Sequence, residues 1–415
     1  MITNSTRNIA LYKVYRIFGY DYLFYSVISF LFFTQVKLIS VAQVMYLLGF
    51  AAIFVAIFQI PTNYFVEKLG LKKSMAIGNL LCVLSCTVLI LGNDFVIFIL
   101  VEALCSLGNC FKGLTETQML YASLKENNKR DKFAKIEGKA VAGYYYVEAL
   151  AALTVGALFN INNYIPILIT LTCLIISFVM SLFFIDVQDK IIKNKSSVKE
   201  YLSGFKLVLK SNRIISIFIY AFVLSGVIVV TTILQKSTIV NLDVLVIPYT
   251  FIFAIITLAV GIGSRAQYKI EKITKRKTLT IIGYMQTISL ILLGMVNIIF
   301  GKNDGVIVTS VIILIIVGIN QGIYRISIKK YMNNFTTSNI RGKILSVFYI
   351  FENIGKSFTL FISGVILDSA GTNLTSVIIG IVSTFILYFI LKFMKKRIGL
   401  DPQNYSKKDV FGIEV

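Results

Sequence analysis

The sequence predicts an all-α integral membrane protein with twelve transmembrane helices, arranged as two pseudo-symmetric six-helix bundles. Three observations predict this class: the mean hydropathy is +0.81, only 15% of the 415 residues are charged, and long apolar runs recur along the whole chain. Soluble domains carry about 25% charged residues. The composition therefore places most of this chain in a lipid bilayer.

Each apolar run is about 20 residues long or longer, which is the helix length that crosses about 30 Å of hydrocarbon. None of the runs alternates apolar and polar residues as barrel strands do. The first run lacks a small-residue cleavage site, so we expect a retained helix rather than a signal peptide. The runs lie at roughly 10–35, 42–66, 74–93, 95–121, 139–159, 164–185, 214–235, 244–264, 278–299, 304–326, 343–367 and 374–394.

The longest polar connection falls near the middle of the chain and leaves six runs on either side. It divides the sequence into an N-terminal bundle at 1–185, a central cytoplasmic loop at 186–213, a C-terminal bundle at 214–394 and a cytoplasmic tail at 395–415. We therefore expect two membrane domains joined by one polar linker.

The basic residues are distributed very unevenly between the two sides of the predicted membrane protein. Outside the runs, every Lys and Arg falls on one side except Lys37, Lys236 and Lys302. Basic residues concentrate on the cytoplasmic side, so both termini are expected there. The net charge of +21 then reflects orientation and contact with anionic lipid, not binding of nucleic acid.

The connection between the second and third runs carries four charges within seven residues, in the segment NYFVEKLGLKKS at 63–74. Gly70 can adopt the left-handed conformation that ends a helix. Lys72 and Lys73 can face lipid phosphates. The alternative is a solvated turn that only sets the direction of the adjoining helices.

The second half of the chain repeats this connection. EKLGLKK follows the second run and EKITKRK follows the eighth, so both segments begin with Glu-Lys and end in a basic cluster. Parallel repeats of this kind are common in transporters, whose substrate site lies near the midplane between the repeats. The second loop carries Glu271, Lys272, Lys275, Arg276 and Lys277, which are therefore candidates for the same role as the residues of the first loop.

The first loop resembles the signature loop of the major facilitator superfamily, because every charge sign of that motif is kept. The segments IALYKVYRIFGYDYLFY, LTETQMLYASLKE and IRGKILSVFYIFENIGKS are similar to its bacterial drug-exporter-like branch. The resemblance implies export of a small organic compound against proton entry, with the acid of the motif holding helices together at a cytoplasmic gate. The matching gate residues are Asn63, Glu67, Lys68, Gly70, Lys72 and Lys73.

Several charged residues lie inside the apolar runs, where a charge costs about 2.5 to 3.5 kcal/mol on insertion scales. Lys112 and Glu116 are four residues apart, and so are Glu352 and Lys356. This spacing puts each pair on one helical face, where an ion pair can form. Each pair is either structural or borders a substrate cavity.

Asp21 and Glu148 have no opposite charge at helical spacing in the sequence. A buried carboxylate without a counter-charge is easier to protonate, as a proton carrier requires. We predict proton coupling by Glu148 first and Asp21 second, although either can instead contact a cationic substrate or pair with Arg16, Lys112 or Lys356 on another helix.

Glu102 is a third coupling candidate, because it stands where many exporters of the superfamily have an Arg. The fifth run also lacks the Gly-Pro pair that antiporters often have, and keeps only small residues there. Both departures make antiport less firmly predicted than transport itself.

Tyrosines flank the coupling candidates on the first and fifth runs. Aromatic faces beside a carboxylate suit a cationic or amphipathic organic molecule, although aromatic residues in membrane helices more often only pack. The substrate-cavity candidates are Tyr20, Tyr22, Tyr25, Lys112, Glu116, Tyr144, Tyr145, Tyr146, Glu352 and Lys356.

The sequence predicts no enzymatic activity, no cofactor and no metal. It has no His, and its five Cys lie inside the runs without the spacing of metal ligands. Gly355-Lys356-Ser357 imitates the end of a phosphate-binding loop but lacks the leading Gly, so no ATP site is expected.

We therefore expect a monomeric transporter in a bacterial cell membrane, whose partners are a small-molecule substrate, protons and lipids. One alternative is an importer or facilitator of a small metabolite. A second alternative, from another class, is a transporter-like receptor or a lipid scramblase. Residue patterns decide neither the substrate nor the direction of transport.

Overall fold

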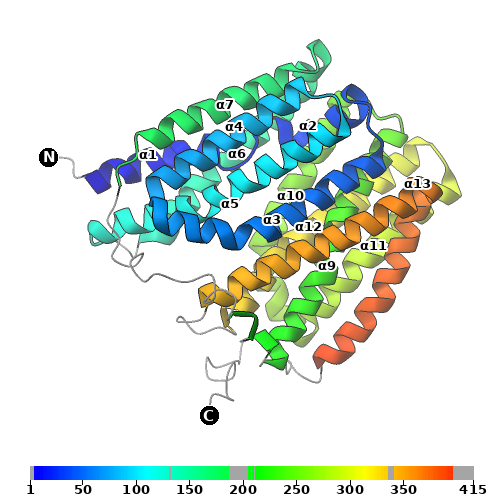
Figure 1. Ribbon diagram of the computed structural model, residues 1–415. Coiled ribbons are helices and arrows are strands. Elements are labelled where there is room, and N and C mark those ends of the chain that lie inside the picture. The colour runs from blue at the N-terminus through cyan, green and yellow to red at the C-terminus, as the bar shows by residue number, and fades with distance from the viewer. Residues whose placement is uncertain are drawn as a thin grey trace. The chain divides into compact units, whose positions relative to one another are not determined.

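The computed structural model describes residues 4–129, 132–186, 204–206, 208–209, 211–334 and 341–395. Within these ranges every regular element is a helix (Figure 1). Ten of the described helices are long and apolar enough to cross a membrane. Most of the predicted central loop at 186–213, and the tail beyond residue 395, lie outside the described residues.

The sequence predicts one continuous helix for the first apolar run, but the structure interrupts it. The run forms α1 (Asn4–Gly19), α2 (Tyr25–Leu31) and the short π-helix η1 (Phe32–Val36). Two local features mark the interruption. The carboxylate of Asp21 accepts a hydrogen bond from the backbone N–H of Tyr22 at 2.8 Å, and Phe24 has a φ of 64°. A side chain that bonds a nearby backbone group competes with helical hydrogen bonding.

The chain divides into two compact units, of which unit 1 comprises Met1–Ile39 and Ile57–Val198. Its helix α1 contacts α5, α6 and α7, and α4 packs along both α5 and α7. The core near α1 includes the buried side chains of Tyr15, Met75, Phe111, Met119 and Phe184. Besides α1 and α2, unit 1 holds the second half of α3 (Val41–Leu69), α4 (Leu71–Leu91), α5 (Phe95–Glu126), α6 (Phe133–Ile161) and α7 (Ile165–Leu182).

Unit 2 comprises Ser40–Ala56 and Lys199–Val415. It holds the first half of α3 together with α9 (Asn212–Asn241), α10 (Val246–Thr274), η4 (Lys275–Lys277), α11 (Thr278–Phe300), α12 (Asp304–Asn334) and α13 (Arg341–Lys395). Gly371, with φ 71° and ψ 172°, separates two helices inside α13.

The first half of α3 packs against α13 in unit 2. The Tyr46 hydroxyl donates a hydrogen bond to Asp368 at 3.0 Å, and the Tyr46 ring stacks on Phe361 at a centroid distance of 6.1 Å. These contacts assign residues 40–56 to the same compact unit as the C-terminal helices.

Gly70 ends α3 and begins α4 with a φ of 82° and a ψ of 166°. The positive φ agrees with the prediction that this glycine makes a turn which other residues adopt only with strain. The ψ value is extended, however, and differs from that of the left-handed helical conformation. The turn is therefore more open than a common helix C-cap.

Helices α4 and α5 cross closely where Gly78 faces Gly108. A methyl group on Gly108 would lie 2.8 Å from the Gly78 carbonyl oxygen and 2.8 Å from the Cys82 sulfur. A backbone oxygen cannot rotate away, so Gly108→Ala is expected to cost about 1 to 3 kcal/mol. The measurement is the melting temperature of the purified protein.

Gly113→Ala is the matched control on the same helix. Apart from the adjoining residues and the backbone of its own helix, no atom lies within 4 Å of a methyl group built at Gly113, and Ala favours helix more than Gly does. We expect its melting temperature to equal or exceed that of the unchanged protein. Equal melting temperatures for the two variants would show that the α4–α5 crossing tolerates a methyl group.

Candidate functional site

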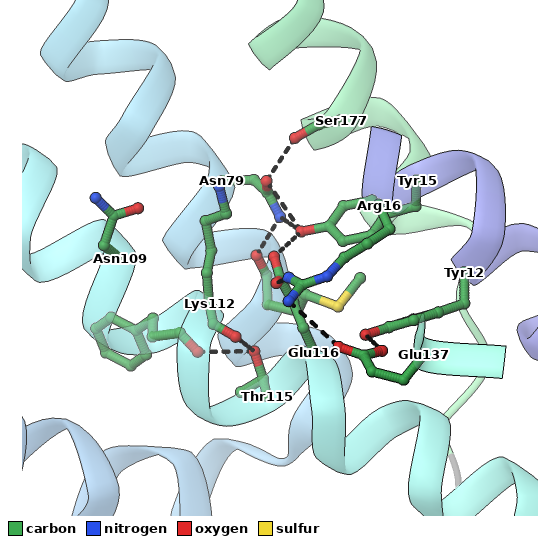
Figure 2. A network of polar contacts seen from close by, with 12 residues as sticks. Tyr12, Tyr15, Arg16, Asn79, Asn109, Lys112, Thr115, Glu116, Glu137 and Ser177 are labelled. Carbon is green, nitrogen blue, oxygen red and sulfur yellow. Dashed lines mark hydrogen bonds and ion pairs between the residues drawn. The ribbon is translucent and has the colours of Figure 1, made fainter. Parts of the chain in front are cut away.

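Unit 1 holds a buried polar network whose centre is Arg16 of α1 (Figure 2). The Arg16 guanidinium forms an ion pair with Glu116 of α5 and lies 3.4 Å from a carboxylate oxygen of Glu137 on α6. The side chains of Arg16 and Glu116 are only 11% and 2% exposed. Tyr12 donates a 2.5 Å hydrogen bond to Glu137. One cation thus connects three helices of the unit.

Neutral side chains complete the hydrogen bonding of Glu116. The Tyr15 hydroxyl donates to Glu116 at 2.5 Å, and the Asn79 amide donates to the Tyr15 oxygen at 2.9 Å. The Ser177 hydroxyl donates to the Asn79 carbonyl oxygen at 2.5 Å. Buried ion pairs persist when further hydrogen bonds satisfy their remaining lone pairs. The network therefore joins α1 to α4, α5 and α7.

The predicted ion pair between Lys112 and Glu116 does not form, because Arg16 occupies the Glu116 carboxylate. A guanidinium offers several donors in a planar fork, which suits a carboxylate better than one ammonium group does. Figure 2 shows the Lys112 side chain directed away from the Glu116 carboxylate. The second predicted pair is confirmed, since Lys356 and Glu352 lie 3.1 Å apart on α13.

The two leading coupling candidates come together in unit 1. Ser26 of α2 donates a hydrogen bond to the Glu148 carboxylate on α6 at 3.3 Å. Asp21, at the break between α1 and α2, is close enough to interact electrostatically with Glu148. Glu148 therefore lies beside the interrupted helix, within electrostatic range of Asp21.

Tyr20 lies between this acidic pair and the Arg16 network. Its ring centroid is 4.7 Å from that of Tyr144 and 5.9 Å from that of Tyr145, and the Arg16 guanidinium is 4.5 Å from it. Tyr146, in contrast, is 73% exposed while Tyr144 is 1% exposed. The two lie on different faces of α6, so Tyr146 does not join the cluster.

Tyr22 and Tyr25 form a second aromatic group near the break. Their ring centroids are 6.3 Å apart, and the Tyr22 hydroxyl lies 3.3 Å from the Ser85 hydroxyl of α4. Glu102 of α5 interacts electrostatically with Tyr25. Polar residues continue along this face of α5 at spacings of three and four, as Glu102, Cys105, Asn109, Lys112 and Glu116; we call this set the α5 polar stripe.

The residues of the first gating loop lie at the junction of α3 and α4. Asn63 is buried, and the Lys68 ammonium lies 4.4 Å from the Tyr64 ring centroid. The backbone N–H of Lys72 donates to the Asp186 carboxylate at 3.3 Å. Because the start of a helix attracts negative charge, Asp186 adds a cap that the motif does not contain. Glu67 and Lys73 lie on α3 and α4, on either side of Gly70.

The second gating loop begins inside α10, not after it. Glu271 is completely buried and accepts hydrogen bonds from Lys330 of α12 at 2.8 Å and from Gln267 at 2.6 Å. Lys272, Lys275 and Lys277 are exposed, whereas the Arg276 side chain lies outside the described residues. Glu271 thus links α10 to α12, while the basic residues form the exposed turn.

Glu271→Gln is expected to cost about 1.5 to 3 kcal/mol, because the substitution removes the ion pair with Lys330 and the charged acceptor of the Gln267 hydrogen bond. The melting temperature of the purified protein measures the effect. Glu126→Gln is the matched control, since Glu126 is exposed at the end of α5. Equal melting temperatures for the two variants would show that the Glu271–Lys330 ion pair contributes nothing to stability.

The sequence predicts Arg16 only as a partner for other acids, and it predicts no site role for Glu137, Asn79, Ser177 and Lys330. Arg16 lies near the start of the first run, where a basic residue also serves to orient the chain. Asn79 and Ser177 are polar residues in apolar runs, which often hydrogen-bond across membrane helices. Their position as polar residues in apolar runs could have indicated a hydrogen-bonding role, but it does not identify the partners.

All five Cys are free thiols. Among the described residues, no group of three or more His, Cys, Asp and Glu side chains is arranged to hold a metal ion. The chemistry of the described site is therefore that of ion pairs, carboxylates and aromatic rings.

Membrane-length helices, an interrupted first helix and buried charges in unit 1 define a multi-pass membrane protein with the features of a solute transporter. The sequence-family model of the Major Facilitator Superfamily matches residues 17–324 of the chain. The chain therefore belongs to this superfamily. Superfamily membership identifies a transporter that is not an enzyme. No curated protein matches the sequence significantly.

Solved structures of transporters share the fold. A mutant of the nucleoside transporter NupG superposes with a TM-score of 0.79 at 14% identity, covering 94% of this chain and 100% of that chain. A POT family transporter in complex with 5-aminolevulinic acid gives a TM-score of 0.68 at 14% identity, covering 94% of this chain and 96% of the other. At such low identity the likeness shows the fold alone.

Proposed function

We propose that this protein is a proton-coupled exporter of a small organic compound that works by alternating access. The observation that carries the proposal is that Glu148 of α6 accepts a hydrogen bond from Ser26 beside the interrupted first helix, within electrostatic range of Asp21. Two neighbouring carboxylates repel each other when both are charged, and one proton removes that repulsion. Proton binding and release at this pair can therefore be linked to a change in conformation.

The proposed membrane topology has twelve spans in two six-helix bundles, at 1–185 and 214–394. The interrupted run formed by α1, α2 and η1 supplies the first span, and Gly371 divides α13 into the last two spans. Both termini are cytoplasmic, and the protein acts as a monomer in a bacterial cell membrane. The positive-inside distribution of Lys and Arg supports this orientation.

The loops after α3 and α10 are proposed as the cytoplasmic gates of the two halves. In the second loop, the Glu271–Lys330 ion pair at 2.8 Å holds α10 and α12 together, which supports this role. Glu67 is proposed to act equivalently in the first loop.

A second candidate is an importer or facilitator of a small metabolite. The likeness to a nucleoside transporter and to a transporter bound to 5-aminolevulinic acid supports this candidate. Both candidates share the fold and the site, and they differ in the direction of net movement and in its dependence on protons.

Reconstitution of the purified full-length protein into vesicles distinguishes the two candidates. The vesicles carry an imposed pH gradient and are tested with cationic dyes, antibiotics and nucleosides, with and without an uncoupler. The proposal expects movement that reverses with the gradient and stops with the uncoupler. Movement indifferent to the gradient would favour a facilitator, and failure to move any compound would contradict both.

A further inference from the structure

The last turns of α10 carry a row of exposed basic residues. Arg265, Lys269 and Lys272 follow one another at spacings of four and three residues, which places them on one face of the helix. All three residues are exposed, and in the described part of the chain none of them takes part in an ion pair. We call these three residues the α10 basic stripe.

The opposite face of the same turns is fixed to α12. Gln267 and Glu271 are 4% and 0% exposed. Glu271 accepts a hydrogen bond from Lys330 at 2.8 Å, and Gln267 donates one to Ser327 at 3.3 Å. With about 3.6 residues per turn, these two residues lie on the side of α10 away from the stripe. Packing against α12 therefore leaves the stripe uncovered.

The face that bears the stripe is apolar in the two preceding turns. Leu258 and Ile262 are 60% and 61% exposed. Apart from the adjoining residues and the backbone of its own helix, no atom lies within 4 Å of a methyl group built at Gly261. The helix is long and apolar enough to cross a membrane, so this uncovered apolar surface suits acyl chains. The change from Ile262 to Arg265 then marks the boundary between hydrocarbon and headgroups.

The stripe extends through the headgroup layer. At about 1.5 Å per residue, the seven residues from Arg265 to Lys272 cover about 10 Å, and each headgroup layer is about 5 to 7.5 Å thick. Tyr268 lies beside the stripe and is 66% exposed, and tyrosine is enriched in this layer. A lipid phosphate at this level is therefore within reach of the basic side chains.

The first half of the chain makes the corresponding turn without such a stripe. With the Glu-Lys pairs of the two loops aligned, Pro61 corresponds to Arg265. In the same alignment Phe65 corresponds to Lys269. The connection between two helices therefore does not require these two basic residues. They point instead to a property of the second half alone.

We propose that the α10 basic stripe binds an anionic phospholipid, whose phosphate pairs with Arg265 and Lys269 and whose acyl chain lies along Leu258 and Ile262. Opposite charge supports this partner, because basic clusters that directly follow a transmembrane helix attract anionic lipids. A zwitterionic phospholipid has no net charge and gains less from three neighbouring cations. The proposal goes beyond the transport function proposed above and depends on neither the substrate nor proton coupling.

Native mass spectrometry of the purified, delipidated full-length protein tests the proposal. The probes are phosphatidylglycerol, which is anionic, and phosphatidylethanolamine, which is zwitterionic, with identical acyl chains. We expect the first phosphatidylglycerol to bind at least about tenfold more tightly than phosphatidylethanolamine, which corresponds to about 1.4 kcal/mol. Phosphatidylglycerol is also expected to raise the melting temperature more, because a ligand that binds only the folded state stabilises it.

A triple variant locates the preference on α10. Arg265→Gln, Lys269→Gln and Lys272→Gln together are expected to make the affinities for the two lipids equal and to abolish the extra rise in melting temperature. All three positions are exposed, so we expect the melting temperature without lipid to stay unchanged. Arg265→Lys, which keeps the charge, is expected to keep the preference.

The matched control removes the same residue types from exposed positions of unit 1, as Arg7→Gln, Lys13→Gln and Lys129→Gln. Its net charge equals that of the stripe variant, and we expect it to keep the preference for phosphatidylglycerol. Equal loss of preference in both triple variants would show that only net charge attracts the lipid, and would overturn the proposal.

Two further results would also overturn it. One is equal affinity of the unchanged protein for the two lipids. The other is displacement of phosphatidylglycerol by an excess of inorganic phosphate, which would show that the stripe binds a free anion and not a lipid. Failure of transport in the vesicle assay would leave the lipid site untouched, since its test measures binding alone.

Discussion

Replacement of Glu148 by Gln is expected to abolish transport driven by a pH gradient, while binding of the substrate stays measurable at a lower affinity. Glutamine has nearly the shape of glutamate and can still accept the hydrogen bond that Ser26 donates to Glu148. It cannot carry a proton in the relevant range, so the acidic pair with Asp21 loses one of its two titratable groups. Substrate flux in vesicles, with and without an imposed gradient, measures the effect.

The control for Glu148→Gln is again Glu126→Gln, which removes an exposed carboxylate from the end of α5. We expect this control to transport at the unchanged rate. Exchange of substrate across the membrane without a gradient should persist in Glu148→Gln, because movement of the bundles does not itself need a proton. Gradient-driven flux at the unchanged rate would remove Glu148 from the coupling mechanism.

Helix positions were predicted well where length and hydropathy decide them. The run predicted at 42–66 became α3 (Val41–Leu69), and the run at 278–299 became α11 (Thr278–Phe300). A bilayer offers no hydrogen-bond partners to the backbone, so a long apolar segment has no alternative to a helix. The positions of these helices can therefore be predicted from the sequence alone.

The break in the first helix could not be predicted in the same way. Asp21 contributes a local hydrogen bond to the break. The Leu23 carbonyl at the break also accepts a hydrogen bond from Thr170 of α7, which is remote in the sequence. Phe24 adopts a positive φ that residue preferences disfavour. Tertiary contacts thus support a conformation that the local sequence does not indicate.

The two predicted ion pairs show the same limit for the site. Glu352 and Lys356 pair as their spacing predicts, whereas Lys112 and Glu116, at identical spacing, do not. The difference comes from Arg16, which reaches Glu116 from another helix. Sequence spacing identifies which charges can meet on one helix, but competition from other helices decides which of them do. The proximity of Asp21 to Glu148 is likewise a product of the fold.

Removal of the Arg16 charge is expected to destabilise the protein by about 3 to 5 kcal/mol. In Arg16→Gln the Glu116 carboxylate stays buried, at 2% exposure, without its cation. Breaking a buried pair from one side is costly because the remaining charge is neither solvated nor neutralised. The measurement is the temperature at which a thiol-reactive dye labels Cys82 and Cys86, which are almost fully buried in the folded protein.

The double variant Arg16→Gln, Glu116→Gln separates loss of the ion pair from loss of packing around Arg16. With both charges gone, no buried carboxylate remains unpaired at Glu116, and we expect the double variant to be more stable than Arg16→Gln. Arg7→Gln is the control, because Arg7 is exposed on the same helix. A double variant that melts no higher than Arg16→Gln would assign the role of Arg16 to its remaining contacts, the carboxylate of Glu137 and the ring of Tyr20.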